Sequence, residues 1–201
     1  MKFLLPGKWS SFRYEIKSVF DESPEAVRAS VFALGFLEHH PRRCVRSLYF
    51  DTFEFQNYLD HVDGAGRRKK YRVRWYDDFS QGKLEVKNRI GDVQSKFVSE
   101  SFPLAGAESR LELALGPVCS TAQIEYNREY YYIPGTEIRC TLDFNLNADF
   151  GGLQVNHSGV IVEVKCEAKD RGSAERFQLD RRQRFSKYIW ALDHKFHGGH
   201  L

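Results

Sequence analysis

Hydrophobic and polar positions alternate with a period of two along most of the chain, which is the pattern of β-strands whose two faces meet different surroundings. In the segment 70–76, basic residues alternate with Tyr71, Val73 and Trp75. The same alternation runs through the segments 12–19, 84–89, 137–144 and 160–167. We therefore expect an α+β fold dominated by antiparallel strands.

Shorter strands and a few helices complete the expected secondary structure. Brief alternating runs predict strands over 45–50, 96–100 and 124–132. One helix is expected to begin at Ser23-Pro24, which supply an N-cap and a proline suited to the first helical position, and to stop at Gly35. Helical spacing of hydrophobic residues predicts further helices over 108–115 and 173–192.

The composition is that of an ordinary folded protein. The chain has 201 residues, of which 42% are hydrophobic and 28% charged; this excludes a disordered or collagen-like chain and suits one domain spanning residues 1–201. The apolar runs are far shorter than the roughly 20 residues that cross a bilayer, so we expect a cytoplasmic protein without a membrane span. The four cysteines are spread singly, which favours buried structural residues over a metal site or a disulfide framework.

The position of the basic residues is more informative than their number. Thirty basic and 27 acidic residues leave a net charge of +3, which is too mild to indicate nucleic-acid binding. A single charged strand face could simply face water, but like charges directly across a sheet repel. A bound polyanion would stabilise many basic residues on one surface, and closure of the sheet into a barrel would place that surface in a polar lumen. Phosphate chains suit such a lumen, because Arg binds phosphate oxygens in a bidentate manner and Lys supplies a point charge.

Several short motifs, spread in order over nearly the whole chain, resemble those of a known family. They are Arg13-Tyr14-Glu15-Ile16-Lys17, Arg46-Ser47-Leu48-Tyr49-Phe50-Asp51-Thr52, Tyr71-Arg72-Val73-Arg74-Trp75-Tyr76, Leu84-Glu85-Val86-Lys87, Tyr126-Asn127-Arg128, Arg139-Cys140-Thr141-Leu142-Asp143, Val162-Glu163-Val164-Lys165 and Phe185-Ser186-Lys187-Tyr188. Together they resemble the VTC (vacuolar transporter chaperone) polyphosphate polymerase domain, one of the CYTH-like triphosphate tunnel metalloenzymes. The resemblance implies a closed antiparallel eight-stranded β-barrel with flanking helices. It also implies a nucleoside triphosphate and inorganic polyphosphate inside the barrel, with Mn²⁺ or Mg²⁺ as cofactor.

The resemblance also implies roles for individual residues. It assigns the metal to Glu163, and it assigns phosphate contacts to Lys17, Arg46, Arg72, Arg74, Lys87, Lys96, Arg128, Arg139 and Lys187. The alternation places six of these on charged strand faces, namely Lys17, Arg72, Arg74, Lys87, Arg139 and Glu163. We expect phosphoryl transfer, through alignment of phosphates and neutralisation of charge, to depend on Lys17, Arg72, Arg74, Lys87 and Glu163. Glu15 and Glu85 are the next candidate metal ligands, and an ion pair with Lys165 is the alternative role for Glu163.

The first motif departs from the pattern of the related tunnel hydrolases. These begin with E-x-E-x-K, whereas this chain has Arg13-x-Glu15-x-Lys17, which removes one possible metal ligand and adds positive charge. The change favours a polymerase that transfers the γ-phosphoryl group of ATP to a polyphosphate chain. A metal-dependent tripolyphosphatase and a non-catalytic polyphosphate or nucleotide binder stay open as alternatives. A single-stranded nucleic-acid binder is a further alternative, but a closed lumen lined with side chains would exclude bases.

Overall fold

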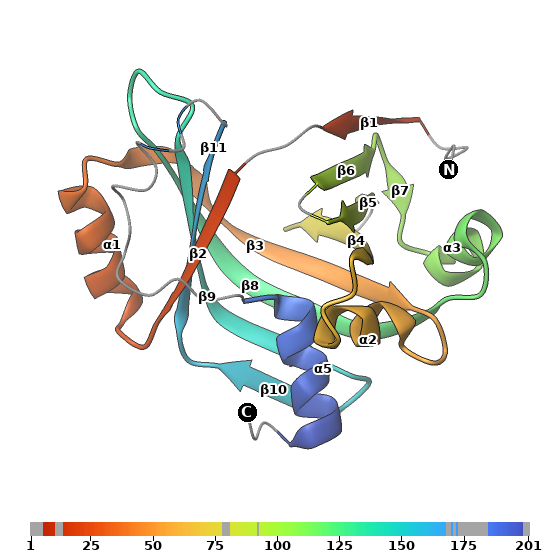
Figure 1. Ribbon diagram of the computed structural model, residues 1–201. Coiled ribbons are helices and arrows are strands. Elements are labelled where there is room, and N and C mark those ends of the chain that lie inside the picture. Colours follow the sequence, from red (N-terminus) through yellow and green to blue (C-terminus); the bar gives the residue numbers. More distant parts are fainter. Residues whose placement is uncertain are drawn as a thin grey trace.

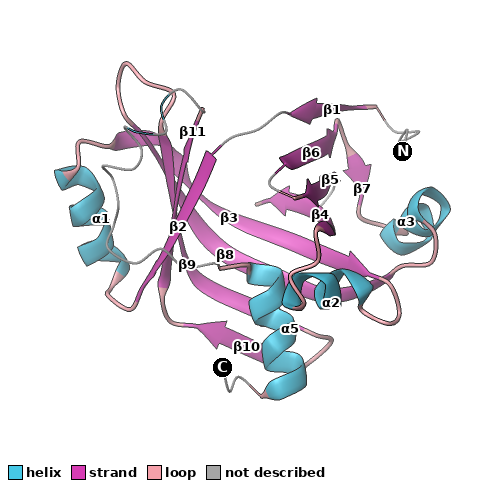
Figure 2. Ribbon diagram, in the orientation of Figure 1, coloured by secondary structure: helices cyan, strands magenta, loops and turns pink. Residues whose placement is uncertain are grey.

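Strands dominate the computed structural model, which describes residues 6–10, 14–77, 81–91, 93–167, 170, 172 and 185–198 (Figure 1). The strands are β1 (Gly7–Ser10), β2 (Tyr14–Phe20), β3 (Leu37–Asp51), β4 (Arg67–Tyr76), β5 (Gln81–Ile90), β6 (Val93–Ser99), β7 (Phe102–Pro103), β8 (Cys119–Tyr132), β9 (Arg139–Asp149), β10 (Gln154–His157) and β11 (Val160–Cys166). The helices are α1 (Pro24–Ala33), α2 (Gln56–Val62), α3 (Ala107–Leu115) and α5 (Lys187–His197). The expected β-dominated class is therefore confirmed (Figure 2).

One curved antiparallel sheet contains these strands. Its hydrogen-bonded order is β1-β6-β5-β4-β3-β8-β9-β11-β2, with β10 paired to β9 and β7 to β5. Strands that follow one another in the chain pair as hairpins at β3-β4-β5-β6 and at β8-β9-β10. Strand β2 follows β1 in the chain but lies at the opposite edge of the sheet, beside β11.

The expected closed eight-stranded barrel is wrong in two respects. The sheet contains eleven strands in the described part of the chain, and no backbone pairing there joins its edge strands β1 and β2. Closure would require a continuous hydrogen-bond ladder between the edges, but β1 has only four residues and pairs with β6. Side chains reach across instead: the Lys87 ammonium on β5 lies 3.9 Å from a Glu15 carboxylate oxygen on β2.

Helices cover parts of both faces of the sheet (Figure 1). On the outer face, α1 packs Val27 and Val31 against the apolar sides of β9 and β11. Leu111 of α3 belongs to a second outer cluster with β4, β5 and β6. A third cluster, which includes Tyr58 of α2 and Leu192 of α5, fills one end of the concave face. The rest of the concave face carries the charged residues described below.

The helix ends follow local capping chemistry. The Ser23 hydroxyl accepts a hydrogen bond from the Ala26 amide at 3.3 Å, as expected for the start of α1. The C-terminal helix continues past the expected end at Leu192 to His197, where Phe196 packs edge-on against Phe55 at a centroid distance of 5.0 Å. The first part of that expected helix, 173–184, lies outside the described residues. Among the helices that are described, none has the length and hydrophobicity to cross a membrane.

Candidate phosphate-binding site

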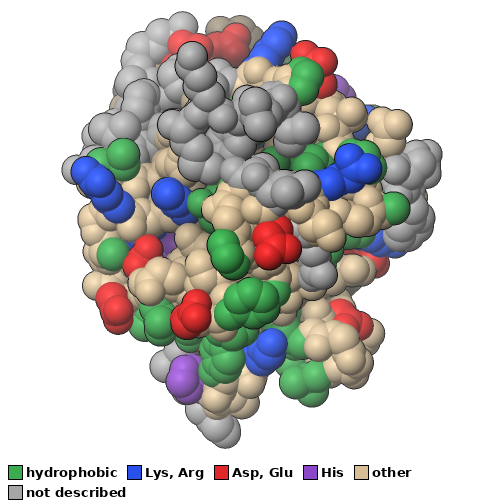
Figure 3. All heavy atoms as spheres, turned by 90° about the vertical axis from the view of Figure 1, so that its right-hand side faces the viewer, with side chains coloured by type: hydrophobic (Ala, Val, Ile, Leu, Met, Phe, Trp, Pro, Cys, Tyr) green, Lys and Arg blue, Asp and Glu red, His purple; other side chains and the backbone are tan. Residues whose placement is uncertain are grey.

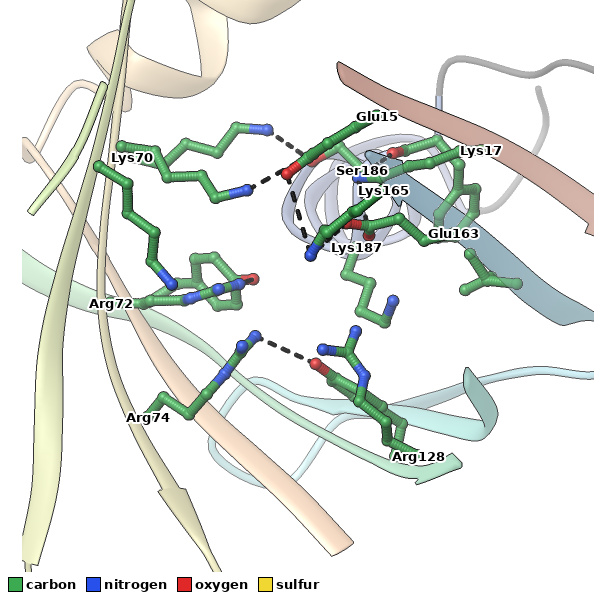
Figure 4. A pocket seen from close by; sticks show the side chains of 16 residues that line it. Glu15, Lys17, Lys70, Arg72, Arg74, Arg128, Glu163, Lys165, Ser186 and Lys187 are labelled. Atoms are coloured by element: carbon green, nitrogen blue, oxygen red, sulfur yellow. Dashed lines mark hydrogen bonds and ion pairs between the residues drawn. The ribbon is translucent and has the colours of Figure 1, made fainter. Parts of the chain in front are cut away.

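The concave face of the sheet encloses a cavity of about 130 Å³ beside the N-terminus of α5 (Figure 4). Its described lining contains nine basic side chains and two carboxylates. The basic ones are Lys17, Lys70, Arg72, Arg74, Lys87, Lys96, Arg128, Lys165 and Lys187, and the acidic ones are Glu15 and Glu163. On the face of the molecule seen in Figure 3, by contrast, basic, acidic and hydrophobic side chains are interspersed. Positive charge is thus concentrated in this cavity, which we call the central cavity.

The wall formed by β4 and β5 is organised around Glu85. Strand register places Arg72 directly opposite Glu85, and the Arg72 Nε donates to its carboxylate at 2.7 Å. Lys96 on β6 donates to the same carboxylate at 2.8 Å. Burial alone would raise the pKa of Glu85, but the cations Arg72, Arg74 and Lys96 hold it well below its usual value. Glu85 therefore stays ionised behind the wall and fixes the direction of the cations.

Arg74 extends into the cavity from the same strand face. Its guanidinium donates to the Tyr126 hydroxyl at 3.0 Å and to the Ser47 hydroxyl at 3.3 Å. These hydroxyls orient the guanidinium, which shares the more distant Glu85 carboxylate, at 3.8 Å, with Arg72 and Lys96. The Arg74 side chain is therefore positioned to bind an anion in the cavity.

The opposite wall is formed by β2 and β11, where acids and bases alternate. Register places Lys17 opposite Glu163 and Glu15 opposite Lys165. The Lys165 ammonium lies 2.6 Å from Glu163 and 3.9 Å from Glu15, and Lys17 lies 3.6 Å from Glu163. Burial opposes ionisation of Glu163, yet Lys165, Lys17 and Lys87 lower its pKa well below the usual value. Glu163 is thus an ionised carboxylate with lysine partners on two sides.

Asp143 on β9 organises the floor of the cavity. Arg128 on β8 donates to both of its oxygens, at 2.5 and 2.6 Å, and Lys187 of α5 donates to one of them at 2.6 Å. The Asp143 side chain is fully buried, and burial opposes its ionisation; Arg128 and Lys187 nevertheless lower its pKa to about 2. The Lys187 ammonium also lies 4.5 Å from the centre of the Tyr126 ring.

Several lysines of the cavity are hard to protonate, because burial and surrounding cations outweigh their acidic partners. Burial is the largest cause, and it lowers the pKa of Lys87 to about 7 and the pKa values of Lys96 and Lys187 to about 8. In each of them a carboxylate raises the pKa, but not enough to restore the usual value. A bound polyanion would raise the pKa values of these lysines again, because nearby negative charge favours the ammonium form.

The structure brings together most of the residues that the sequence singled out. Those that line the central cavity are Lys17, Arg72, Arg74, Lys87, Lys96, Arg128, Lys187, Glu163 and Glu15. Glu85 lies behind the lining, held by its basic neighbours. Arg13, the basic residue that replaces the first acid of the tunnel-hydrolase motif, lies outside the described residues.

Two of the expected phosphate contacts lie elsewhere. Arg46 alternates with Ser47 along β3, so it projects from the other face of the sheet, where its Nε donates to Glu125 at 2.5 Å. Arg139 is on the same face of β9 as Asp143, but it is the first residue of that strand. It contacts His39 at 2.5 Å and does not belong to the described lining.

Five polar residues of the lining, Tyr49, Lys70, Tyr126, Lys165 and Ser186, had no phosphate-binding or metal-binding role assigned from the sequence. Lys70 and Lys165 occupy alternate positions beside Arg72 and Glu163, so the period-two pattern already placed them on charged faces. Tyr49 and Tyr126 carry no such signal, because aromatic residues also occur at core positions of β3 and β8. Ser186 is recognisable only as the N-cap of α5.

A comparison with protein families identifies a match over the first half of the chain. The family model for the VTC domain matches residues 12–113. That range covers β2 to α3, whereas Arg128, Glu163 and Lys187 lie beyond it. No match was found among curated proteins.

Solved structures share the fold across nearly the whole chain. An adenylyl cyclase candidate from Hippeastrum, described as having a dominant triphosphatase activity, is 18% identical with a TM-score of 0.56, covering 90% of this chain and 96% of its own. An adenylate cyclase candidate from Vibrio parahaemolyticus is 17% identical with a TM-score of 0.56, covering 90% and 98%. The PH1819 protein from Pyrococcus horikoshii OT3 is 13% identical with a TM-score of 0.55, covering 91% and 98%. These likenesses establish the CYTH-like triphosphate tunnel fold, here with an open sheet.

Proposed function

Because this chain belongs to the VTC domain family, we propose that it transfers the γ-phosphoryl group of ATP to a polyphosphate chain held in the central cavity. The charge balance of the cavity carries the proposal. Nine basic side chains face the cavity against two carboxylates in the described lining, with Glu85 and Asp143 placed behind it. A phosphate chain supplies the negative charges that this lining lacks.

Phosphoryl transfer depends mainly on alignment of the reacting groups and on stabilisation of charge, so the protein has little covalent work to do. Arg72 and Arg74 on one wall and Lys17 on the other would hold the donor and acceptor phosphates between them. Arg128 and Lys187 would hold phosphate oxygens at the floor, where Asp143 fixes both cations. Each of these side chains binds and orients the phosphates or neutralises their charge.

The ionisation of Glu163 favours phosphoryl transfer over hydrolysis. Attack by water needs a group that accepts its proton, and such a base works best with a pKa near the operating pH. The basic neighbours of Glu163 hold its pKa well below the usual value, which makes it a poor base. A terminal phosphate oxygen of polyphosphate is already anionic and needs no base: it would bond to the γ-phosphorus of ATP while the bond from that phosphorus to the bridging β,γ-oxygen breaks and ADP leaves.

A divalent cation fits this site only together with phosphate. The described residues contain no cluster of three or more His, Cys, Asp or Glu side chains suited to a metal. Glu163 and Glu15 do line the same wall, and Mg²⁺ is often held by one or two carboxylates plus substrate phosphates. These two residues would therefore hold Mn²⁺ or Mg²⁺ jointly with the phosphates. A cation bound there supplies charge neutralisation to phosphate oxygens.

The proposal is tested with purified protein, ATP and Mn²⁺, by gel analysis of polyphosphate and a free-phosphate assay. We expect phosphate chains to accumulate. Arg72→Ala should slow their formation by roughly 10- to 100-fold, because it removes one charge-assisted contact. Arg46→Ala is the matched control: it removes an arginine from the other face of the sheet and should leave the rate unchanged. Binding of ATP without turnover would refute the proposal.

Hydrolysis of a triphosphate is the second candidate function. The Hippeastrum neighbour, whose description names a triphosphatase activity, favours it, although an identity of 18% carries the fold alone. In the same assay, release of free phosphate without longer chains would favour this function over polymerisation.

A further inference from the structure

Lys70 is distinguished from the other cations of the central cavity by its partners. Each of the other eight lies within 4.0 Å of a carboxylate oxygen. The pairs are Lys17–Glu163, Lys87–Glu15, Lys96–Glu85, Lys165–Glu163, Lys187–Asp143, Arg72–Glu85, Arg74–Glu85 and Arg128–Asp143. Among the described residues, no carboxylate oxygen lies within 4.0 Å of the Lys70 ammonium.

One hydroxyl is the recorded partner of Lys70. Its ammonium donates to the Ser186 Oγ at 2.7 Å, and the same oxygen accepts the Ile189 amide at 3.4 Å as the N-cap of α5. An ammonium group has three donors, so two remain for another acceptor. In Figure 4, Lys70 lies on the same wall as Arg72 and Arg74, with Ser186 across from it.

The surroundings of Lys70 add positive charge. Register places it directly opposite Lys87 on β5. Its pKa is lowered well below the usual value, first by burial and then by Lys17, Lys87 and Arg72. The nearby His61 on α2 stays neutral, since burial and Lys70 lower its pKa to about 3. No carboxylate among the described residues thus compensates the charge of Lys70, whereas an anion in the cavity would.

We propose that Lys70 and the Ser186 hydroxyl form a further phosphate subsite between β4 and the N-terminus of α5, occupied by one phosphoryl group of the bound chain. The inference rests on the proposed function. The Lys70 ammonium donates to a phosphate oxygen there, and the Ser186 O–H can donate to the same group while its oxygen still caps the helix. The aligned amides at the start of α5 favour negative charge at this position.

The test compares Lys70→Met with Lys69→Met. Lys69 is the neighbouring residue on the other face of β4, and its side chain is exposed, so the same change there leaves the cavity intact. Affinities for tripolyphosphate and pyrophosphate are measured by calorimetry in metal-free buffer. We expect Lys70→Met to weaken tripolyphosphate binding by roughly 10- to 100-fold. The variant should lose less affinity for pyrophosphate, because a shorter chain can leave this subsite empty. Lys69→Met should bind both as the wild type does.

Thermal unfolding gives a second readout. Without ligand, Lys70→Met should raise Tm, because it removes a buried charge that has no carboxylate partner. Tripolyphosphate should then stabilise the variant less than the wild type. Should Lys70→Met not fold, Lys70→Gln and Ser186→Ala provide the same comparison of affinities.

The outcomes separate the subsite from the proposed function. If a folded Lys70 variant binds tripolyphosphate as tightly as the wild type does, the subsite is overturned. The proposed function is not affected by that result, because the wild type still binds tripolyphosphate. Failure of the wild type to bind tripolyphosphate or ATP refutes the proposed function, and the subsite with it.

Discussion

Glu163 lies between Lys165 and Lys17, and this position limits what its carboxylate can do. Its low pKa keeps it anionic, which suits a ligand of a hard cation and not an acceptor of protons. In the free protein the two ammonium groups already neutralise it. Phosphates that attract these lysines would free its oxygens for a metal.

We expect Glu163→Gln to separate binding from turnover. The change keeps the size of the side chain but removes the negative charge, so metal-dependent turnover should fall by at least 100-fold. Affinity for tripolyphosphate should stay the same or increase, because Lys165 and Lys17 lose their internal partner. Turnover is followed by the phosphate assays and affinity by calorimetry.

Glu25→Gln is the matched control for that experiment. Glu25 lies in the first turn of α1 with a largely exposed side chain, and its recorded partner is Arg28 at 3.9 Å. It should have wild-type turnover. Full activity of Glu163→Gln would place the metal elsewhere, and loss of folding would identify the ion pair as its main role.

At the residue level, alternation in the sequence identified which residues share a strand face. It could not show which face becomes concave, because that depends on the packing of helices far away in the chain. Arg46 illustrates this limit: the motif around it resembles the family, yet it projects from the other face and pairs with Glu125. Pairings such as Arg72 with Glu85 depend on hairpin register, which the period alone does not determine.

Asp143 connects three elements, since it lies on β9 and binds cations from β8 and α5. Its side chain is fully buried, and Arg128 is nearly so. This contact holds the N-terminus of α5 against the floor of the cavity.

Asp143→Asn should therefore destabilise the fold. It leaves Arg128 and Lys187 buried without a counter-charge, and removal of one partner of a buried ion pair costs about 3–5 kcal/mol. Urea unfolding measures the loss, and tripolyphosphate should restore part of it by supplying negative charge to the same cations. Asp149→Asn, at the end of β9, is the control and should change stability less, because the amide oxygen can still accept from the Gly151 and Gly152 amides and no buried cation loses its partner. Equal stability of Asp143→Asn and the wild type would contradict this account.

At the element level, α1 and the longer strands could be predicted from the sequence because their signals are local, whereas the short strands β1, β7 and β10 were not predicted. The open sheet did not, because the pairing of edges is decided by contacts between segments far apart in the chain. The extension of α5 to His197 likewise depends on packing of Phe196 against Phe55.

For the whole molecule, a net charge of +3 conceals a strongly uneven distribution. Basic residues dominate the central cavity, where burial lowers lysine pKa values. Binding of a polyanion should therefore be linked to binding of protons.

We expect deprotonation of Lys96 and Lys187 to lower ATP affinity as the pH rises above about 8. Burial lowers the pKa values of Lys96 and Lys187 to about 8 in the free protein, and a bound phosphate raises both again. Below pH 7 both lysines are charged in either state, so they add no pH dependence. Above pH 8 the free lysines lose their protons, and the complex must take protons up. Calorimetry in two buffers of different ionisation enthalpy measures this uptake, and an absence of uptake at pH 8.5 would contradict the assignment.

The gap between β2 and the strands β5 and β6 has a consequence for long substrates. A sealed tube admits a polymer only by threading from one of its ends. Here the seam is bridged by side chains such as Glu15 and Lys87, with a separation of 3.9 Å, and an ion pair of this kind separates far more easily than a ladder of backbone hydrogen bonds. If the proposed function holds, we expect a polyphosphate much longer than the protein to load sideways at an internal position, with both of its ends remaining in solution.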